Sequence, residues 1–372
     1  MRLAWFNIVH DRVRFTVTVL GIMCAVFLIV FQGSMLLGFM RAASKIIDTT
    51  DADIWITGRG VPCFEFPTPI ERRLVELTRG IPGVAEAGRI SIGQILIRKA
   101  NGVRQQVLLV GADTEVGPRF PVPYISGDSG PLAPDALVID QSNAKLLDIS
   151  HVPLEVEAND RHARVIAETS GFSSFIGSPY VFTSYDDAAK YIRLAPDETM
   201  FLLLRLKAGV PVRLVERNLR ARFPNVDVWS RAAFSWQARW YWISQTGAGG
   251  AILLGALLGC FIGLAIVSQA VYATTMEHIE EFATLKALGG SRQFIAGVIV
   301  GQASICGLVG YLLGILITVP MVKIVTASIP WVYTPWWLPL AALIPTLGIC
   351  VLASVLSVKA ALDVEPARVF RA

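Results

Sequence analysis

Four long runs without a single Asp, Glu, Lys or Arg constrain the fold of this chain more than any other feature of its sequence. The runs are Phe15–Met40, Tyr241–Met276, Phe294–Val322 and Trp337–Val358. An α-helix needs about 20 apolar residues to cross the hydrocarbon core of a bilayer, and each run is at least that long. The first run is also too long for the apolar core of a cleaved signal peptide. The sequence therefore predicts four transmembrane helices.

The segment between the first two runs, residues 41–240, is the only large polar region, and it has the size of one or two small domains. Helical and strand patterns are interspersed in it, and Asn101-Gly102 and Asn159-Asp160 mark two β-hairpin turns. This mixture fits an α+β domain better than a doubly wound parallel sheet. The Pro- and Gly-rich stretch Pro118–Pro134 is the candidate boundary between two subdomains.

Basic residues predict how the chain is oriented in the membrane. They gather at the two chain ends and between the second and third runs, at Arg2, Arg12, Arg14, Lys286, Arg292, Lys359, Arg368 and Arg371. The short segment between the third and fourth runs carries only Lys323. The positive-inside rule then places both termini in the cytoplasm and the large polar region outside, in the periplasm if the cell has two membranes.

The stretch Glu277–Arg292, between the second and third runs, has the pattern of a short helix outside the bilayer. Glutamates open it, and Ile279, Phe282 and Leu285 recur every three residues, with Leu288 as a candidate fourth member. Gly289-Gly290 supplies a stop before the capping residue Ser291. Two alternatives are open for its apolar stripe. The stripe lies back on lipid or on the chain's own helices, or it docks into a groove on a soluble partner.

Glycines spaced four residues apart occur in two of the predicted spans. They are Gly255, Gly259 and Gly263, then Gly297 and Gly301, then Gly310 and Gly314. This spacing lets helix backbones approach closely in lipid. The glycines serve packing within one chain, or they form a dimer seam or a moving surface.

Several functions are excluded or disfavoured. The spans lack ionisable residues, which argues against an ion-driven carrier and against a hydrophilic pore. A phosphate-binding loop requires a Gly-Lys pair, and no lysine here follows a glycine, so we expect ATP to bind another chain. The four histidines have no metal-ligand spacing, no nucleophile–base arrangement stands out, and the net charge of +4 does not point to nucleic acid. We therefore expect a non-catalytic chain that holds neither metal nor cofactor.

Three stretches resemble the FtsX/MacB group of ABC transporter permeases, and within it the DevC-type exporter permeases. They are RLAWFNIVHDRVRFTVTVLGIMCAVFLIVFQGSMLLGF near the N-terminus, EEFATLKALGGSRQFI after the second run, and LDVEPARVFR at the C-terminus. The resemblance covers both ends and the membrane region and is looser over residues 50–235. The chain departs from the family pattern at Gly290, where Ala is frequent, and at Val364 and Glu365, which separate Asp363 from Pro366.

The resemblance implies four transmembrane α-helices with a large α+β extracytoplasmic domain between helices 1 and 2. That domain would have a porter-like base and an inserted subdomain. The expected order is an amphipathic N-terminal helix at 1–14, transmembrane helix 1 at 15–40, the extracytoplasmic domain at 41–240, transmembrane helix 2 at 241–276, a cytoplasmic coupling helix and turn at 277–292, transmembrane helix 3 at 293–322, an outer loop at 323–336, transmembrane helix 4 at 337–358, and a cytoplasmic tail at 359–372.

By the same resemblance, the chain is the permease subunit of an ATP-driven export complex in the inner membrane. ATP and Mg would bind a separate ABC ATPase, and a second copy of the permease would complete a homodimer. ATPase motion would reach the extracytoplasmic domain by mechanotransmission, through the coupling helix and the spans. A membrane fusion protein and an outer-membrane duct are the further partners expected.

The coupling residues expected in Glu277–Arg292 follow from the resemblance and the stripe together. Phe282 and Leu285 are the candidate docking pair, with Glu280, Glu281 and Lys286 as its charged rim and Gly289 as the turn into the third span. On this hypothesis, Phe282→Asp leaves the chain inserted but uncouples it from its ATPase.

Three other functions are compatible with the sequence. One is an FtsX-like signalling or regulatory permease that drives a cell-wall hydrolase or senses a ligand without moving a substrate. Another is a permease of the same architecture that extracts lipoproteins or haem, which would show an apolar cleft between the first two spans. The third is a membrane-anchored binding module without an ATPase. Nothing in residues 41–240 names a substrate.

Overall fold

The computed structural model describes residues 12–99, 101–113, 117, 124–127 and 132–363. The chain divides into two compact units, which we call the helical unit, residues 1–38 with 248–372, and the α+β domain, residues 39–247. The predicted N-terminal helix at 1–14 lies almost entirely outside the described residues. So do most of the predicted tail at 359–372 and parts of the stretch Pro118–Pro134.

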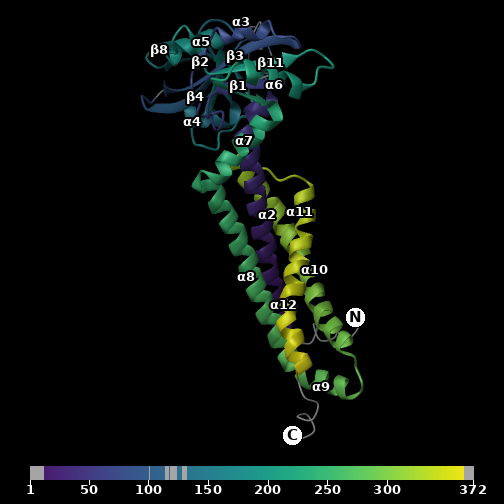
Figure 1. The fold of residues 1–372 in the computed structure, drawn as a ribbon. Helices are drawn as coiled ribbons and strands as arrows, with labels where there is room; N and C mark the ends of the chain where they lie inside the picture. The colour runs from purple at the N-terminus through teal and green to yellow at the C-terminus, as the bar shows by residue number, and fades with distance from the viewer. Residues whose placement is uncertain (1–11, 100, 114–116, 118–123, 128–131, 364–372) are drawn as a thin grey trace. The chain divides into compact units, whose positions relative to one another are not determined.

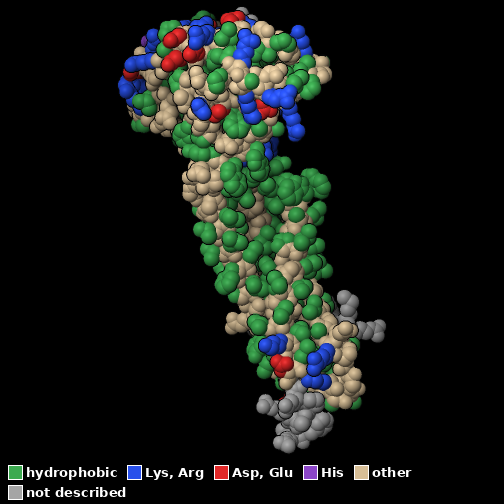
Figure 2. Space-filling view, in the orientation of Figure 1, with side chains coloured by type: hydrophobic (Ala, Val, Ile, Leu, Met, Phe, Trp, Pro, Cys, Tyr) green, Lys and Arg blue, Asp and Glu red, His purple; other side chains and the backbone are tan. Residues whose placement is uncertain are grey.

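Four of the described helices are long and apolar enough to cross a membrane, as the sequence predicts. The helices of this part of the chain are α2 (Arg12–Thr49), α8 (Gly247–Glu277), α9 (Ile279–Ala287), α10 (Arg292–Ser328), α11 (Trp337–Ala341) and α12 (Leu343–Asp363). Helices α2, α8, α10 and α12 run side by side (Figure 1). Within the helical unit, hydrophobic side chains cover the lengths of these helices, and charged side chains gather at the end near α9 (Figure 2).

The helices extend beyond the charge-free runs that predicted them. Helix α2 ends at Thr49 rather than near residue 40, α10 at Ser328 rather than 322, and α12 at Asp363 rather than 358. The first charge marks where an apolar surface ends, whereas a helix ends where its backbone hydrogen bonds end. The predicted second span at 241–276 is interrupted at Gln245 and Thr246, between α8 and the separate helix α7 (Arg231–Ser244).

A ten-stranded mixed sheet forms the centre of the α+β domain. Its order is β12-β1-β11-β3-β4-β9-β6-β8-β5, and β7 pairs with β3 and β8. The strands are β1 (Ile54–Gly58), β3 (Val84–Arg98), β4 (Arg104–Ala112), β5 (Tyr124–Gly127), β6 (Ala136–Asp140), β7 (Leu154–Ala158), β8 (Arg161–Thr169), β9 (Tyr180–Ser184), β11 (Phe201–Leu206) and β12 (Val226–Ser230). A separate pair joins β2 (Ile70–Glu71) to β10 (Glu198–Thr199). The helices of the domain are η1 (Gln141–Asn143), α3 (Leu74–Arg79), α4 (Ala144–Leu147), α5 (Tyr185–Tyr191), α6 (Val212–Arg222) and α7.

Both predicted hairpin turns are confirmed. Strands β3 and β4 pair antiparallel around Asn101-Gly102, where Gly102 has φ +81° and the Asn101 side chain accepts a hydrogen bond from the Val103 amide. Strands β7 and β8 pair around Asn159 and Asp160, with φ values of +47° and +61°. Asn and Asp tolerate this left-handed conformation better than other residues that have a side chain, which is why such pairs mark hairpin turns.

Two apolar cores lie along the sheet. One is built from both ends of the domain sequence, by β1, α3, β11, α6 and β12. The other is built from the middle, by β4, β6, β8, β9, α4 and α5. Strand β3 contributes to both cores, with Val84 and Ala87 in the first and Ile95 and Ile97 in the second. The long strand β3 therefore connects the two apolar cores within one continuous sheet.

Helix α7 is anchored in the domain by Phe234, which is fully buried. Its ring centroid lies 5.4 Å from that of Trp55 on β1 and 6.1 Å from that of Phe201 on β11. Such aromatic contacts add to the stabilisation from area burial. Phe234 thus joins the helix that precedes the second span to the central strands.

We expect Phe234→Ala to lower the free energy of unfolding of the α+β domain by about 3–5 kcal/mol, because it leaves a cavity among aromatic rings. The measurement is denaturant unfolding of the full chain in detergent. Trp236→Ala is the matched control, since Trp236 lies on the same helix and is 59% exposed. Equal losses in the two variants would contradict the anchoring role of Phe234.

Candidate functional site

Helix α9 is the short helix that the sequence predicts between the second and third spans. Glu280 and Glu281 lie in its first turn and are exposed. Gly289 follows it with φ +91°, a conformation that favours glycine, and the Gly290 amide donates to the Leu285 carbonyl. The Ser291 hydroxyl accepts a hydrogen bond from the Phe294 amide, so Ser291 caps α10 as expected.

The structure corrects the placement of the expected docking pair. Phe282 is only 3% exposed and belongs to the apolar core of the helical unit, with Leu285 packed partly buried against that core. The stripe therefore lies back on the chain's own helices, the first of the two alternatives. A three-residue repeat shows that one face is apolar but does not identify what covers it. Phe282→Asp would place a charge in this core, so it is not a clean test of docking.

Lys286 also has an intramolecular contact. Its ammonium group donates to the Leu362 carbonyl of α12 at 2.7 Å. This bond satisfies one of the last carbonyls of α12 and fixes α9 against that helix. Of the expected rim residues, Glu280 and Glu281 face solvent, and Leu288, just beyond α9, is 81% exposed.

The expected packing glycines fall into two groups. A Cβ on Gly255, Gly259 or Gly263 would lie 2.5–2.8 Å from the Gln32, Leu28 or Ala25 side chain of α2, respectively. Gly310 and Gly314 of α10 face α2 in the same way, at 2.7 Å from Ile22 and 2.9 Å from Val26. These five glycines therefore serve packing within the chain. Apart from the adjacent backbone of α10 itself, no described residue lies within 4 Å of a Cβ on Gly297 or Gly301.

We expect Gly259→Val to destabilise the helical unit by about 1–3 kcal/mol, because the added side chain overlaps Leu28 and forces α8 away from α2. The midpoint of thermal unfolding in detergent measures this. Gly301→Val is the matched control, and it should leave the midpoint nearly unchanged. Equal destabilisation by the two substitutions would contradict the grouping of the glycines.

A buried carboxylate in the α+β domain is a second site, which the sequence did not reveal. Glu65 accepts hydrogen bonds from the Tyr180 hydroxyl of β9 at 2.8 Å and from the Trp242 indole Nε1 of α7 at 3.2 Å. The Cys63 thiol is a third hydrogen-bond partner. Burial raises the pKa of Glu65, although these three donors act in the opposite direction. Burial and the neighbouring carboxylate raise the pKa of Tyr180 and Cys63 as well.

The raised pKa of Glu65 predicts a pH dependence of stability. The folded protein holds this proton more tightly than the unfolded chain, in which the ordinary pKa is 4.5. The stabilising contribution is therefore complete below pH 4.5 and is lost as the pH rises through the folded pKa.

We expect the free energy of unfolding of the wild type, relative to Glu65→Gln, to fall as the pH rises above 4.5 and then to level off. Denaturant unfolding across a pH series measures this difference. Glu155→Gln, at an exposed position on β7, controls for the loss of one carboxylate. A difference that rises with pH would show that the hydrogen bonds to the ionised form outweigh its burial.

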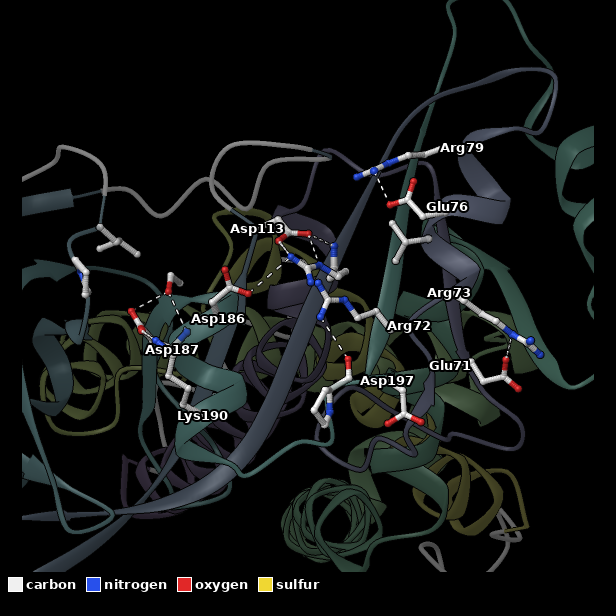
Figure 3. A pocket seen from close by; sticks show the side chains of 16 residues that line it. Glu71, Arg72, Arg73, Glu76, Arg79, Asp113, Asp186, Asp187, Lys190 and Asp197 are labelled. Atoms are coloured by element: carbon white, nitrogen blue, oxygen red, sulfur yellow. Dashed lines mark hydrogen bonds and ion pairs between the residues drawn. The ribbon is translucent and has the colours of Figure 1, made fainter.

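A charged groove with a volume of about 1250 Å³ lies in the α+β domain (Figure 3). One side carries Glu71, Arg72, Arg73, Glu76 and Arg79 from β2, α3 and the turn between them, and the other carries Asp186, Asp187 and Lys190 from α5. The Arg89 guanidinium contacts both carboxylate oxygens of Asp113 at 2.7 and 3.0 Å and lies 3.9 Å from the Tyr185 ring centroid.

The residues that line the groove determine which kind of ligand it could bind. Sites for apolar small molecules are lined mainly by hydrophobic side chains. Most of the described lining residues here are charged, and several form ion pairs, among them Arg79–Glu76 and Lys190–Asp187. The groove therefore suits a hydrophilic, charged ligand or peptide. Among the described residues, no group of three or more metal-ligating side chains could hold a metal ion.

Two regions of the chain match the models of known protein families. Residues 15–222, more than half of the chain, match the MacB-like periplasmic core domain, and residues 246–366 match the FtsX-like permease C-terminal family. The chain belongs to the FtsX/MacB-like family of ABC transporter permeases. The predicted family is thereby confirmed, whereas the finer resemblance to DevC-type permeases stays a prediction.

Other relatives of this FtsX/MacB-like permease have been described. Two Mycobacterium tuberculosis proteins, from strains CDC 1551 and H37Rv, are named uncharacterized ABC transporter permeases; each is 24% identical over 340 residues, covering 90% of this chain and 88% of the relative. The periplasmic region of MacB from Actinobacillus actinomycetemcomitans is 13% identical and covers 50% of this chain and 90% of its own, with a TM-score of 0.38. The extracellular domain of YknZ, a noncanonic ABC-type transporter from Gram-positive bacteria, is 11% identical and covers 48% and 99%, with a TM-score of 0.36.

The FtsX/MacB-like permease is therefore a multi-pass membrane protein. It has four transmembrane α-helices, with a MacB-like α+β domain between the first and the second. As an ABC transporter permease, it works with an ATPase.

Proposed function

We propose that this permease is a non-catalytic subunit of an ATP-driven export complex and transmits the motion of a separate ATPase chain to its α+β domain. The observation that supports this most directly is the continuity of α2. This single helix of 38 residues starts in the helical unit and ends in the α+β domain. A continuous hydrogen-bonded helix is stiff, so a displacement of its membrane part is carried along its axis.

The proposed orientation places both termini and α9 in the cytoplasm and the α+β domain on the outer side of the inner membrane. It rests on the basic residues of the chain ends and of Glu277–Arg292. ATP and Mg bind the ATPase in this proposal, because no lysine of the chain follows a glycine.

The contact with the ATPase is proposed for the exposed face of α9 and the turn after it. Glu280 and Glu281 supply charge at the start of the helix, and Leu288 supplies an exposed apolar side chain beyond its end. Phe282, Leu285, Lys286 and Gly289 then support this face from within the chain. An exposed leucine beside charged residues is a suitable anchor for a groove on a soluble partner.

We expect Leu288→Asp to weaken co-purification of the ATPase with the permease about tenfold, because a desolvated apolar contact is replaced by a charge. Quantitative pull-down from detergent extracts measures this. Leu253→Asn, at an exposed position on α8 away from α9, is the control and should retain the ATPase. Retention of the ATPase by Leu288→Asp would exclude this residue from the contact.

The rest of the complex is proposed from the family resemblance. It comprises a second permease copy, a membrane fusion protein and an outer-membrane duct. The alternative of a lipoprotein- or haem-extracting permease requires an apolar cleft between the first two spans. The close contacts of α2 with Gly255, Gly259 and Gly263 of α8 do not favour that alternative.

Co-purification from native membranes tests the proposed function. A tag on the C-terminus, extraction in mild detergent and mass spectrometry identify the chains that accompany the permease. We expect an ABC ATPase together with a membrane fusion protein. An ATPase with a cell-wall hydrolase or a sensor kinase would instead indicate an FtsX-like signalling permease. Absence of an ATPase, in an extract where a known ABC complex survives, would refute the proposal.

A further inference from the structure

Helices α2 and α7 meet inside the α+β domain as an antiparallel pair held by polar contacts. Arg239 of α7 binds Asp48 of α2 at 2.7 Å and donates to the Ser44 hydroxyl at 2.8 Å. Closer to the end of α7 that leads to the second span, the rings of Phe39 and Trp242 lie edge to face, with their centroids 6.4 Å apart. Because α2 is itself the first span and α7 precedes the second span by only two residues, both helices lead directly into the membrane helices.

Strand β12 continues directly into α7 at Arg231, which also donates hydrogen bonds to the Asp53 and Thr50 carbonyls. Two further contacts join the helix pair to the sheet. Phe234 packs among Trp55 and Phe201, and such an apolar contact tolerates small rotations and shifts. The indole of Trp242 donates to Glu65, whose other oxygen accepts from Tyr180 on β9. Hydrogen bonds weaken steeply when their angle changes, so this second contact restrains the rotation of α7 near the end that leads to the second span.

The Glu65 carboxylate cannot exchange these hydrogen bonds for hydrogen bonds to solvent. Glu65 is buried, with 7% of its surface exposed, and both oxygens are occupied by donors from different elements. Release of either donor would leave a buried acceptor without its partner, which is costly in a medium of low polarity. Buried polar groups of this kind can specify one packing arrangement among several that an apolar core would allow.

We propose that Glu65 is a positioning residue for energy coupling. It holds α7, and with it α2, against β9, so that a displacement of the two helices, which enters the sheet at one end through β1 and β12, also reaches β9 directly. This inference rests on the proposed function, since it requires ATP-driven motion of the spans.

The deciding variant replaces Glu65 and its two aromatic donors by apolar side chains, as Glu65→Met with Tyr180→Phe and Trp242→Phe. The third partner, the Cys63 thiol, is a weak donor that behaves as a small apolar group, and it is kept. Such replacement of a complete buried network is often neutral for stability, so the fold should survive. The phenyl ring at position 242 keeps contacts with Phe39 and Phe175. Trp242→Phe alone is a second variant, which removes only the donor on α7. Trp240→Phe makes the same chemical change at a side chain that is 55% exposed, and it is the matched control.

The experiment uses the full permease with its co-purified ATPase in lipid nanodiscs. Spin labels on an unnatural amino acid at positions 103 and 333 leave the native cysteines in place; Val103 and Tyr333 are 55% and 40% exposed. The distance distribution between the labels is recorded without nucleotide and after trapping with ATP and vanadate. Thermal unfolding and the ATPase rate are measured on the same samples.

We expect ATP to shift the distribution in the wild type and in Trp240→Phe. In the triple variant and in Trp242→Phe, the shifted fraction should fall about fivefold or more, the factor that one buried hydrogen bond contributes to an equilibrium. The triple variant should retain its unfolding midpoint and ATPase rate, whereas Trp242→Phe alone should also lower the midpoint, because it leaves a buried acceptor unpaired. A wild-type shift in the triple variant would overturn the role of Glu65. No shift in the wild type would overturn the proposed function itself.

Discussion

The close approach of α2 to its neighbours through glycines is the constraint on which the helical unit depends. In lipid, apolar side chains gain nothing by leaving solvent for one another, so helices associate through close packing. Gly259 and Gly263 bring α8 against α2 from one side, and Gly310 and Gly314 bring α10 against it from another. Val26 and Val30 of α2 are fully buried as a result. The first span is thus the central helix of the unit, and it is also the helix that continues into the α+β domain.

Features encoded by neighbouring residues could be read from the sequence. Charge-free runs gave four spans, Asn101-Gly102 gave a hairpin, and Gly289-Gly290 with Ser291 gave the end of one helix and the start of the next. Helix ends without such local signals were predicted too early in the sequence. Helix α2, for example, continues to Thr49 after its apolar surface ends. The break before α8 was missed for the same reason, since the apolar run Tyr241–Met276 passes through it without interruption.

Features that depend on distant residues could not be predicted in this way. Tyr180 and Trp242 lie 115 and 177 residues from Glu65 along the chain, and no local pattern connects them. The one available signal was an acidic residue between two phenylalanines, Phe64 and Phe66. The charged groove could not be predicted for the same reason, because its walls come from segments that are separate in the sequence. The stripe of α9 shows the intermediate case: its apolar face was predicted, but the sequence left open whether the chain's own helical core or a partner covers it.

Strand β3 has a further consequence for how the α+β domain loses its structure. Its first half packs in one apolar core and pairs with β11, its second half packs in the other core and pairs with β4, and the two ladders share only Ile90. Each core can therefore open together with its own ladder while the other ladder stays paired. The two halves of β3 should then exchange their amide hydrogens as two separate cooperative units.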